Sequence, residues 1–429
     1  MGLKISVIGG GSTYTPELIE GLAARRDRLP IDELVLHDID PVRREVVGGL
    51  ARRMLDHVGW TGSLTDTDDA SAAIDGASFV LVQLRVGGQA ARLVDETLPL
   101  RFGTIGQETT GAGGFAKALR TVPVVLELAE IAAHRAAPGA WIVDFTNPVG
   151  IVTQALLDAG HRAVGLCNVA ITLQRGLAAR LGVDPERVKL EHVGLNHLSW
   201  IRAVRVDGED RLPELLELHG AAIAADIGLP LATVQRLRAV PSYYLRYYYT
   251  FEDVLDEQRG GHHRAEEVID LERRLLDLYR DPMLVTKPSL LADRGGAFYS
   301  EAAAQLLASL HDGRGDVQVV DVRNAGALPD LDDGDVVEIP AVVDRAGARP
   351  QPTAPLGAEL ADLVRRVKHY ERLTISAATS GDRTAALEAL RANPLVDGRA
   401  PAEPLLAALL EANRQHLPRF YPAVADASS

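Results

Sequence analysis

Short apolar runs alternate with amphipathic stretches over roughly the first 165 residues of the chain. Apolar runs that end at glycine, proline or acidic residues are typical of buried strands, and apolar positions three or four residues apart indicate helices. Strands that alternate with helices predict a parallel, doubly wound α/β sheet. The expected strands are residues 3–8, 33–40, 79–84, 141–148 and 162–167, and two of the expected helices are Pro41–His57 and Phe115–His134.

The rest of the chain mixes the two patterns. Strand-like runs are HLSWIRAVRV (197–206), VQVVDV (317–322) and DVVEIPAVV (335–343), and helical spacing appears at 264–279, 360–379 and 404–416. This mixture predicts an α+β lobe for substrate binding and oligomerisation. We therefore expect two domains, a Rossmann-like dinucleotide-binding domain of residues 1–166 and an α+β domain of residues 167–429.

Composition narrows the class of protein. The formal charge is −14, which disfavours a nucleic-acid partner because neutralising phosphates requires a basic face. An anionic substrate would need a local cationic pocket against this global charge. The single cysteine allows no internal disulfide and is typical of a reducing cytoplasm. The chain opens directly on a strand and has no apolar run long enough to span a bilayer, so we expect a cytoplasmic protein without a signal peptide or membrane contact.

A glycine-rich turn joins the first strand to the first helix, in VIGGGSTYTPEL (7–18). Glycines let the backbone approach a pyrophosphate, and the helix N-terminus supplies amide donors. An acid at the end of the second strand binds the adenine ribose and favours NAD over NADP, although Arg43 and Arg44 nearby leave that choice open. A tight turn beside a surface acid is the alternative. The residues expected to bind the dinucleotide are Gly9, Gly10, Gly11, Ser12, Thr13 and Asp38, and Thr15 is expected to cap the helix.

The only cysteine, Cys167 in VGLCNVA (164–170), follows an apolar strand at the sheet edge where α/β proteins bind ligands. Thirty residues later, GLNHLSW (194–200) brings His197. Cysteine and histidine both bind metals, and a substrate could complete the coordination sphere. Two alternatives stay open: a buried cysteine that only packs, and nucleophilic Cys–His catalysis.

Taken together, the motifs resemble glycoside hydrolase family 4, the NAD- and divalent-metal-dependent glycosidases, and within it the 6-phospho-β-glucosidases. They follow family order over about the first 270 residues, and such glycosidases are an exception to the usual two-carboxylate chemistry. The segments that carry the resemblance are VIGGGSTYTPELIEGL (7–22), QLRVGGQAARLVDETLPLRFGTIGQETTGAGGF (83–115), DFTNPVG (144–150), GLCN (165–168), GLNHLSW (194–200), SYYLRYYY (242–249) and RAEEV (264–268).

The resemblance implies hydrolysis of 6-phospho-β-glucosides through transient oxidation of the sugar. NAD⁺ would take the hydride from C3, which acidifies the C2 proton. A base would remove that proton while the metal stabilises the enediolate. The aglycone would be eliminated, water would add, and the hydride would return to C3. The alternatives are the same chemistry on unphosphorylated β-glycosides and a net NAD-dependent 2-hydroxyacid dehydrogenase of the malate or lactate type.

The resemblance also implies roles for individual residues. Cys167 and His197 are the implied ligands of Mn²⁺ or another divalent metal, and Tyr244 is the implied base, for which a run of packing tyrosines is the alternative. Glu108 is a candidate for orienting metal-bound water, with a plain glycine loop as the alternative. Arg264 would hold the phosphate or merely pair with Glu267. The implied substrate-binding residues are Arg92, Asn147, Asn168 and Arg264.

Two departures from the family pattern bear on specificity. Asn168 stands where α-glycoside enzymes commonly carry an aspartate, which tilts the expectation toward β-linked substrates. Ala170 replaces a common proline beside the sugar-phosphate end, and His262 and His263 would add donors there or remain solvated loop residues. We expect a sugar-phosphate glycoside as the partner and a homodimer or homotetramer as the assembly.

Overall fold

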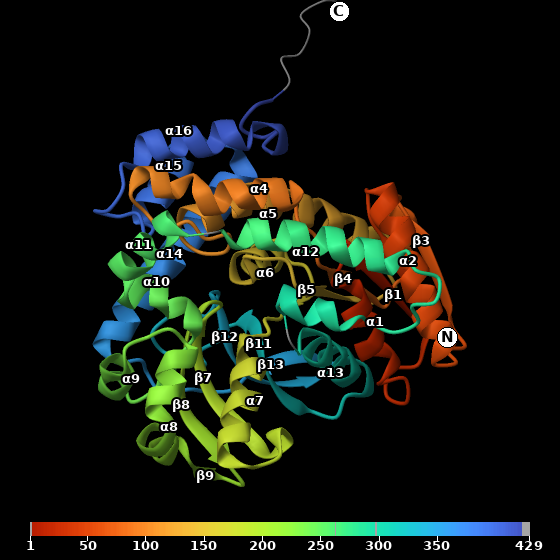
Figure 1. Cartoon of the computed structure of the whole chain (residues 1–429), viewed down its shortest axis with the longest axis horizontal. Helices are drawn as coiled ribbons and strands as arrows, with labels where there is room; N and C mark the ends of the chain where they lie inside the picture. The colour runs from red at the N-terminus through yellow and green to blue at the C-terminus, as the bar shows by residue number, and fades with distance from the viewer. Residues whose placement is uncertain (1, 262, 297, 423–429) are drawn as a thin grey trace, which may run out of the picture.

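The structure is a computed structural model that describes residues 2–261, 263–296 and 298–422. A nine-stranded sheet runs through the centre of the molecule (Figure 1). The strand order is β13-β12-β11-β6-β5-β4-β1-β2-β3. Strands β1 to β6 are parallel, and β11, β12 and β13 extend the sheet as antiparallel strands beyond β6. Their bounds are β1 Leu3–Ile8, β2 Ile31–His37, β3 Ser63–Thr67, β4 Phe79–Val82, β5 Trp141–Asp144, β6 Ala163–Gly165, β11 Asp316–Arg323, β12 Val336–Asp344 and β13 Gly347–Pro350.

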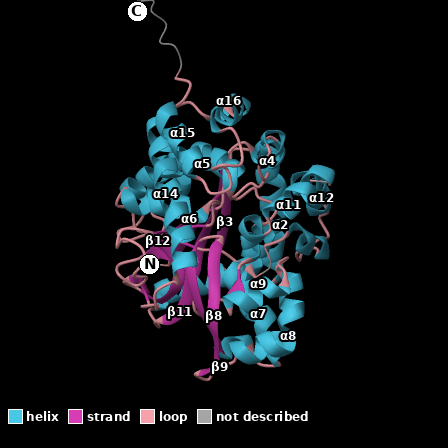
Figure 2. Cartoon of the chain, turned by 90° about the vertical axis from the view of Figure 1, so that its left-hand side faces the viewer, coloured by secondary structure: helices cyan, strands magenta, loops and turns pink. Residues whose placement is uncertain are grey.

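Helices cover both faces of this sheet, as Figure 2 shows. Along β4, Phe79 and Leu81 pack into one apolar cluster and Val80 and Val82 into another, so successive side chains enter cores on opposite faces. The helices are α1 Thr15–Ala23, α2 Pro41–His57, α3 Ala70–Ile74, α4 Gly88–Thr97, α5 Gly111–Arg135, α6 Val149–Asp158, α7 Val169–Leu181, α8 Leu212–Asp226, α9 Leu231–Leu237, α10 Arg246–Tyr249, α11 Phe251–Gly260, α12 Arg264–Tyr279, α13 Tyr299–Asp312, α14 Ala358–Ser380, α15 Arg383–Ala392 and α16 Ala402–Ala412.

A second, antiparallel sheet lies beside α7 and α8 in the lower half of Figure 1. Its order is β10-β8-β7, with β9 paired to β8. Leu195 pairs with Leu198, so β7 and β8 form a hairpin whose turn is Asn196 and His197. The strands are β7 Val188–Leu195, β8 Leu198–Val206, β9 Glu209–Asp210 and β10 Val240–Pro241.

The predicted fold class, a Rossmann-like sheet with an α+β lobe, is confirmed, and the three strands expected after residue 190 are present. One local expectation is wrong. Thr15 does not cap α1, because its hydroxyl donates to the Gly10 carbonyl at 2.8 Å instead. The nine-stranded sheet contains strands from both sides of residue 166, so the division at that point stays a prediction.

Within the described part of the chain, no helix combines the length and the apolar character that crossing a membrane requires. The carboxyl ends of β1, β4, β5 and β6 meet at one edge of the large sheet, because these strands are parallel. The loops that follow β1, β5 and β6 contain Gly9 to Thr13, Asn147, and Cys167 with Asn168, whereas the other predicted site residues come from other elements.

Candidate active site

The glycine turn after β1 is closely packed against the neighbouring strands. Gly9 has a positive φ of 87°, and its amide donates to the His37 carbonyl at 2.9 Å. Gly11 donates its amide to Asp38 Oδ2 at 2.8 Å, and a Cβ on Gly11 would come within 2.6 Å of that oxygen. The turn and the acid are therefore a single unit, with the carboxylate fixed at the end of β2, where a ribose would bind.

The two arginines near Asp38 already have acidic partners. Arg43 pairs with Glu272 at 2.5 Å, and Arg44 lies 3.5 Å from Asp66 and 3.3 Å from Asp68. A 2′-phosphate would have to compete with these carboxylates for the guanidinium groups. The geometry therefore favours NAD, the choice that the sequence left open.

Helix α12 anchors the second half of the turn. Thr13 donates its hydroxyl to Glu272 at 3.3 Å, and the Tyr279 hydroxyl donates to the Thr13 carbonyl at 2.7 Å. Ser12 Oγ accepts the Tyr14 amide at 3.2 Å. All six residues predicted to bind the dinucleotide are thus close together, from Gly9 to Thr13 and at Asp38.

Cys167, His197 and Tyr244 converge from three separate parts of the chain. Cys167 follows β6, His197 lies in the β7–β8 turn with a φ of 62°, and Tyr244 belongs to the short 3-10 helix Tyr243–Leu245. The Cys167 sulfur lies 3.5 Å from His197 Nε2. The rings of His197 and Tyr244 stack with centroids 3.6 Å apart.

This pair of donors fits a divalent metal. Metal bonds of about 2.0 to 2.3 Å place two neighbouring ligands roughly 3 to 3.6 Å apart, which the observed separation matches. Among the described residues no cluster of three or more His, Cys, Asp or Glu side chains is arranged to hold a metal ion. A metal at Cys167 and His197 would therefore take its remaining ligands from water and substrate.

Burial keeps all three groups neutral in the protein alone. It raises the pKa of Cys167 and of Tyr244 well above their ordinary values, with nearby Glu338 acting in the same direction on Cys167. Burial lowers the pKa of His197 to about 4, which keeps the imidazole unprotonated and able to bind a metal. Since the thiol and the phenol lack a strong positive neighbour, a bound cation would be the group that favours their ionised forms.

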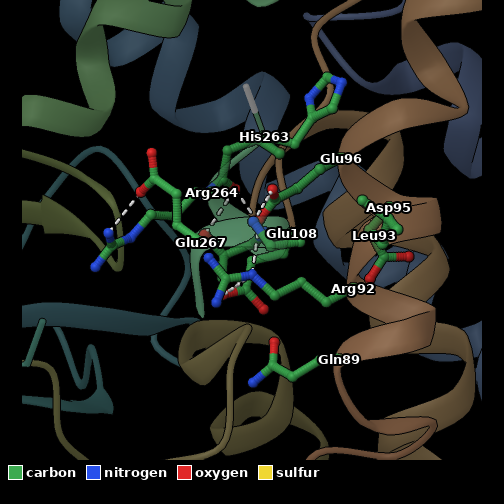
Figure 3. Close-up of polar contacts among 12 residues, drawn as sticks. Gln89, Arg92, Leu93, Asp95, Glu96, Glu108, His263, Arg264 and Glu267 are labelled. Carbon is green, nitrogen blue, oxygen red and sulfur yellow. Dashed lines mark hydrogen bonds and ion pairs between the residues drawn. The ribbon is translucent and has the colours of Figure 1, made fainter. Parts of the chain in front are cut away.

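A group of basic side chains lies near this centre, since the charge of Lys117 acts on His197 and the charges of Arg85 and Arg92 act on Arg294. We call Arg85, Arg92, Lys117 and Arg294 the basic cluster (Figure 3 shows its Arg92). Arg294 pairs with Glu272 at 3.0 Å, whereas Glu108 is the shared partner of the other three: it pairs with Arg85, with Arg92 at 3.3 Å and with Lys117 at 2.7 Å. These cations hold the pKa of Glu108 well below its usual range although burial alone would raise it. Glu108 is therefore an ionised carboxylate.

Arg294 adds positive charge to the same region. Burial, opposed by Glu272 and reinforced by Arg85, lowers its pKa, and its Nε is buried with no hydrogen-bond partner among the described residues. The positive charges of the basic cluster lie close together although the chain as a whole has a net charge of −14. This is the local cationic environment that an anionic substrate requires.

The remaining predicted substrate-binding residues differ in their surroundings. Arg92 is buried and pairs with Glu96 at 2.7 Å. Asn147 has a buried Oδ1 with no hydrogen-bond partner among the described residues, and Asn168 stands directly before α7. Arg264 turns toward Glu267, at 2.7 Å, as Figure 3 shows, so its predicted phosphate contact stays a prediction. His262 lies outside the described residues.

The sequence alone did not identify several residues of the site. Lys117 and Glu338 are charged residues inside apolar segments, GGFAKAL (113–119) and VVEIPAVV (336–343). A buried charge in such a segment usually has a partner, and that was the signal available for both. Arg85 lies in a segment that carries the family resemblance but was not singled out there, and Arg294 lies in none of the quoted segments; the fold brings both of them near Glu272.

Family models match nearly the whole chain. The model of family 4 glycosyl hydrolase matches residues 4–183, and that of the family 4 glycosyl hydrolase C-terminal domain matches residues 192–396. A Bacillus subtilis protein named "Probable 6-phospho-beta-glucosidase" is 40% identical over 98% of this chain and 98% of its own length.

Solved structures agree with these matches. The 6-phospho-beta-glucosidase of Thermotoga maritima, determined with manganese, NAD⁺ and glucose-6-phosphate, has a TM-score of 0.90 and 36% identity, covering 96% of this chain and 99% of its own. The malate dehydrogenase of Plasmodium falciparum, in complex with NADH, has a TM-score of 0.55 at 14% identity, covering 88% of this chain and 98% of its own. The second likeness extends to the fold alone.

Proposed function

This chain belongs to the family 4 glycosyl hydrolases, and from that premise we propose that it hydrolyses 6-phospho-β-glucosides with NAD and a divalent metal ion, preferably Mn²⁺. The observation that carries the proposal is the convergence of Cys167, His197 and Tyr244 at the same sheet edge as the glycine turn. Full-length similarity to 6-phospho-beta-glucosidases supports it.

Each residue has a distinct task in this scheme. A bound dinucleotide would supply reversible hydride chemistry, and a bound divalent metal would supply positive charge that stabilises developing oxyanions of the sugar. Cys167 and His197 hold the metal, and Tyr244 takes the C2 proton on its phenolic oxygen. Asp38 fixes the adenine ribose and Gly9 to Thr13 form the pyrophosphate turn.

The basic cluster supports a phosphorylated substrate. The four cations of the basic cluster share three carboxylates, Glu96, Glu108 and Glu272, and an anion such as a sugar 6-phosphate would balance the charge that remains. Arg92, Asn147, Asn168 and Arg264 are proposed to contact this substrate. The same chemistry on unphosphorylated sugars would leave the cluster without its ligand.

A net dehydrogenase is the less favoured function. The likeness to malate dehydrogenase is confined to the fold, and the Cys167–His197 pair has no purpose in that reaction. The two functions differ in the fate of the hydride, because a glycosidase returns it to the sugar in every turnover.

A single assay distinguishes these functions. Purified protein with NAD⁺ and Mn²⁺ is mixed with 4-nitrophenyl β-glucoside 6-phosphate, and nitrophenol and NADH are followed by absorbance. We expect nitrophenol release without accumulation of NADH, and little release from the unphosphorylated glucoside. Stoichiometric NADH would instead indicate a dehydrogenase, and equal rates on both glucosides would remove the proposed role of the basic cluster.

Oligomeric state and compartment remain part of the proposal. A homodimer or homotetramer is the proposed assembly, but the apolar side chains of α14 and α16 pack into the core of this chain and are not available for an interface. The single cysteine suits the cytoplasm. Sedimentation velocity of the purified chain would report the assembly directly.

A further inference from the structure

Strand β12 places a buried carboxylate behind the predicted metal ligands. Glu338 is 1% exposed and lies directly opposite Asp321 of β11, which is fully buried. Fully buried carboxylates are rare unless hydrogen bonds hold them. The two acids differ in this respect, because Glu338 has two side-chain partners whereas both carboxyl oxygens of Asp321 have none among the described residues.

Both partners of Glu338 belong to the hairpin that presents His197. Oε2 lies 2.9 Å from His192 Nε2, and Oε1 accepts the Asn196 amide at 3.1 Å. His192 is in β7, and Asn196 is the turn residue directly before His197. The Glu338 carboxylate of β12 therefore makes hydrogen bonds to strand β7 and to the β7–β8 turn at the same time.

The β7–β8 turn requires stabilising contacts of this kind because its backbone conformation is unfavourable on its own. His197 has a φ of 62°, in the left-handed region that non-glycine residues seldom adopt. Residues held in this region persist only when their surroundings fix them, and they cluster at functional sites. Stacking on Tyr244 holds the imidazole ring and the Leu195–Leu198 pair closes the hairpin, but neither contact fixes the side chain of Asn196 within the turn.

Asn196 transmits this constraint to His197, because the two residues are adjacent in the turn. His197 Nε2 lies 3.5 Å from the Cys167 sulfur, so the geometry of the donor pair depends on the position of the turn.

We propose that Glu338 is a positioning residue for the metal site: by holding His192 and Asn196, it fixes the β7–β8 turn so that His197 Nε2 faces the Cys167 sulfur. The inference rests on the proposed metal role of Cys167 and His197. Outer-shell partners of this kind typically change metal affinity by about 10- to 100-fold when removed.

Position and charge can be separated at Glu338 itself. Glu338→Gln keeps the length and the acceptor for Asn196, and its amide can donate to His192 when that histidine carries its proton on Nδ1. Glu338→Asp keeps the charge, but it withdraws the oxygens by about one bond length. Positioning requires the reach of the side chain, whereas a purely electrostatic role requires its charge.

The experiment measures Mn²⁺ dissociation constants of the NAD⁺-loaded protein by electron paramagnetic resonance of free Mn²⁺. We expect Glu338→Ala and Glu338→Asp to weaken binding by about tenfold or more, and Glu338→Gln to stay within about threefold of wild type. Asp321→Asn is the matched control, equally buried and on the adjacent strand, and it should bind Mn²⁺ like wild type. NAD⁺ affinity should not change in any variant.

The Glu338→Asp and Glu338→Gln variants test the positioning role even if Glu338→Ala does not fold. Wild-type affinity in Glu338→Asp, or weaker binding in Glu338→Gln than in Glu338→Asp, would overturn the positioning role. A general loss of structure would lower the melting temperature and NAD⁺ affinity together with Mn²⁺ affinity. Cys167→Ser separates the two proposals: if it too binds Mn²⁺ like wild type, the metal site itself is misassigned, and if only the Glu338 variants do, the inference alone fails.

Discussion

At the scale of the residue, burial governs the chemistry of this site. Tyr244 and Cys167 are both driven toward their neutral forms by burial, and His197 is kept unprotonated by the same effect. A phenol in this state is a poor base until positive charge is placed beside it. The close stacking of Tyr244 on His197 would put the phenol near any cation that His197 binds.

Replacing Tyr244 by Phe tests its role as the base. The variant keeps the ring that stacks on His197 but lacks the oxygen that takes the proton, so kcat should fall by about 10²- to 10⁴-fold while Mn²⁺ and NAD⁺ affinities persist. Mass spectrometry in deuterated water should show solvent deuterium at C2 of recovered sugar with wild type and almost none with the variant. Tyr248→Phe is the control, and unchanged exchange in Tyr244→Phe would contradict the assignment.

Glu272 gives a pH dependence of stability. Burial raises its pKa, but Arg294 and Arg43 outweigh that effect and lower it to about 2, below the ordinary value of 4.5. Because the folded-state pKa is depressed, the stabilisation is complete above about pH 4.5 and is lost as the pH falls toward 2. The shift corresponds to at most about 3 kcal/mol.

Denaturant unfolding of wild type and Glu272→Gln between pH 2 and 7 measures this contribution. The free-energy difference between the two proteins should be largest above about pH 5 and should shrink as the pH falls through the window between about 4.5 and 2. Glu267→Gln, an exposed position on the same helix, should follow wild type throughout. A difference that is constant with pH would show that the arginines do not depend on the Glu272 charge.

At the scale of the element, sequence patterns predicted those features, such as the bounds of a helix, that depend on contacts between residues close in sequence. Helix α2 has the expected bounds, because Asp40 caps it and Pro41 opens it. Thr15 failed as a cap because the glycine turn offers its hydroxyl a nearer partner, the Gly10 carbonyl. The strands β11 and β12 were predicted as strands, but no local pattern says which sheet a strand joins.

The residues of the candidate site likewise fall into those that sequence patterns predicted and those that only the fold brings together. Cys167 and His197 were predicted from their residue types and from the sheet edge that Cys167 follows, and Tyr244 was predicted from its resemblance to a family motif. Glu338 was missed because its partner Asn196 lies 142 positions away along the chain. A sequence pattern describes residues that are close along the chain, whereas contacts between distant segments depend on tertiary packing.

The glycine turn makes an element-scale prediction. Gly11→Ala would place a methyl group 2.6 Å from Asp38 Oδ2 and displace the carboxylate that is proposed to bind the ribose. Loss of one charge-assisted hydrogen bond, about 1.5 kcal/mol, should weaken NAD⁺ binding by about tenfold, measured by calorimetry. Gly49→Ala, in helix α2 with only Arg53 Nη1 near at 3.5 Å, should bind NAD⁺ normally and be slightly more stable. Equal affinity in both variants would contradict the packing argument.

At the scale of the whole molecule, the large sheet ties the ends of the chain together. Strand β11 pairs with β6 through Asp321 and Gly165, and Leu306 and Leu307 of α13 are buried in the same apolar cluster as residues of β1 and β4. The first half of the sheet therefore depends on residues after 300 for its edge and for one of its cores.

A truncation tests this dependence. A fragment of residues 1–166 should be aggregated or largely unfolded when expressed alone, because it exposes the apolar face that α13 covers and leaves β6 unpaired. Circular dichroism, gel filtration and NAD⁺ binding, with the full chain as reference, would report the outcome. A monomeric fragment that unfolds cooperatively and binds NAD⁺ would make residues 1–166 an independent domain.

The two-donor metal site also has a thermodynamic consequence. Since Cys167 and His197 are the two donors that the described chain brings together, an ion bound there would have positions that sugar oxygens can fill in place of water, so occupancy by either one would favour the other. Linkage is reciprocal: saturating glucose 6-phosphate should tighten Mn²⁺ by the same factor by which Mn²⁺ tightens glucose 6-phosphate. The protein would then release metal and product in concert, and its apparent demand for manganese in an assay would fall as the sugar concentration rises.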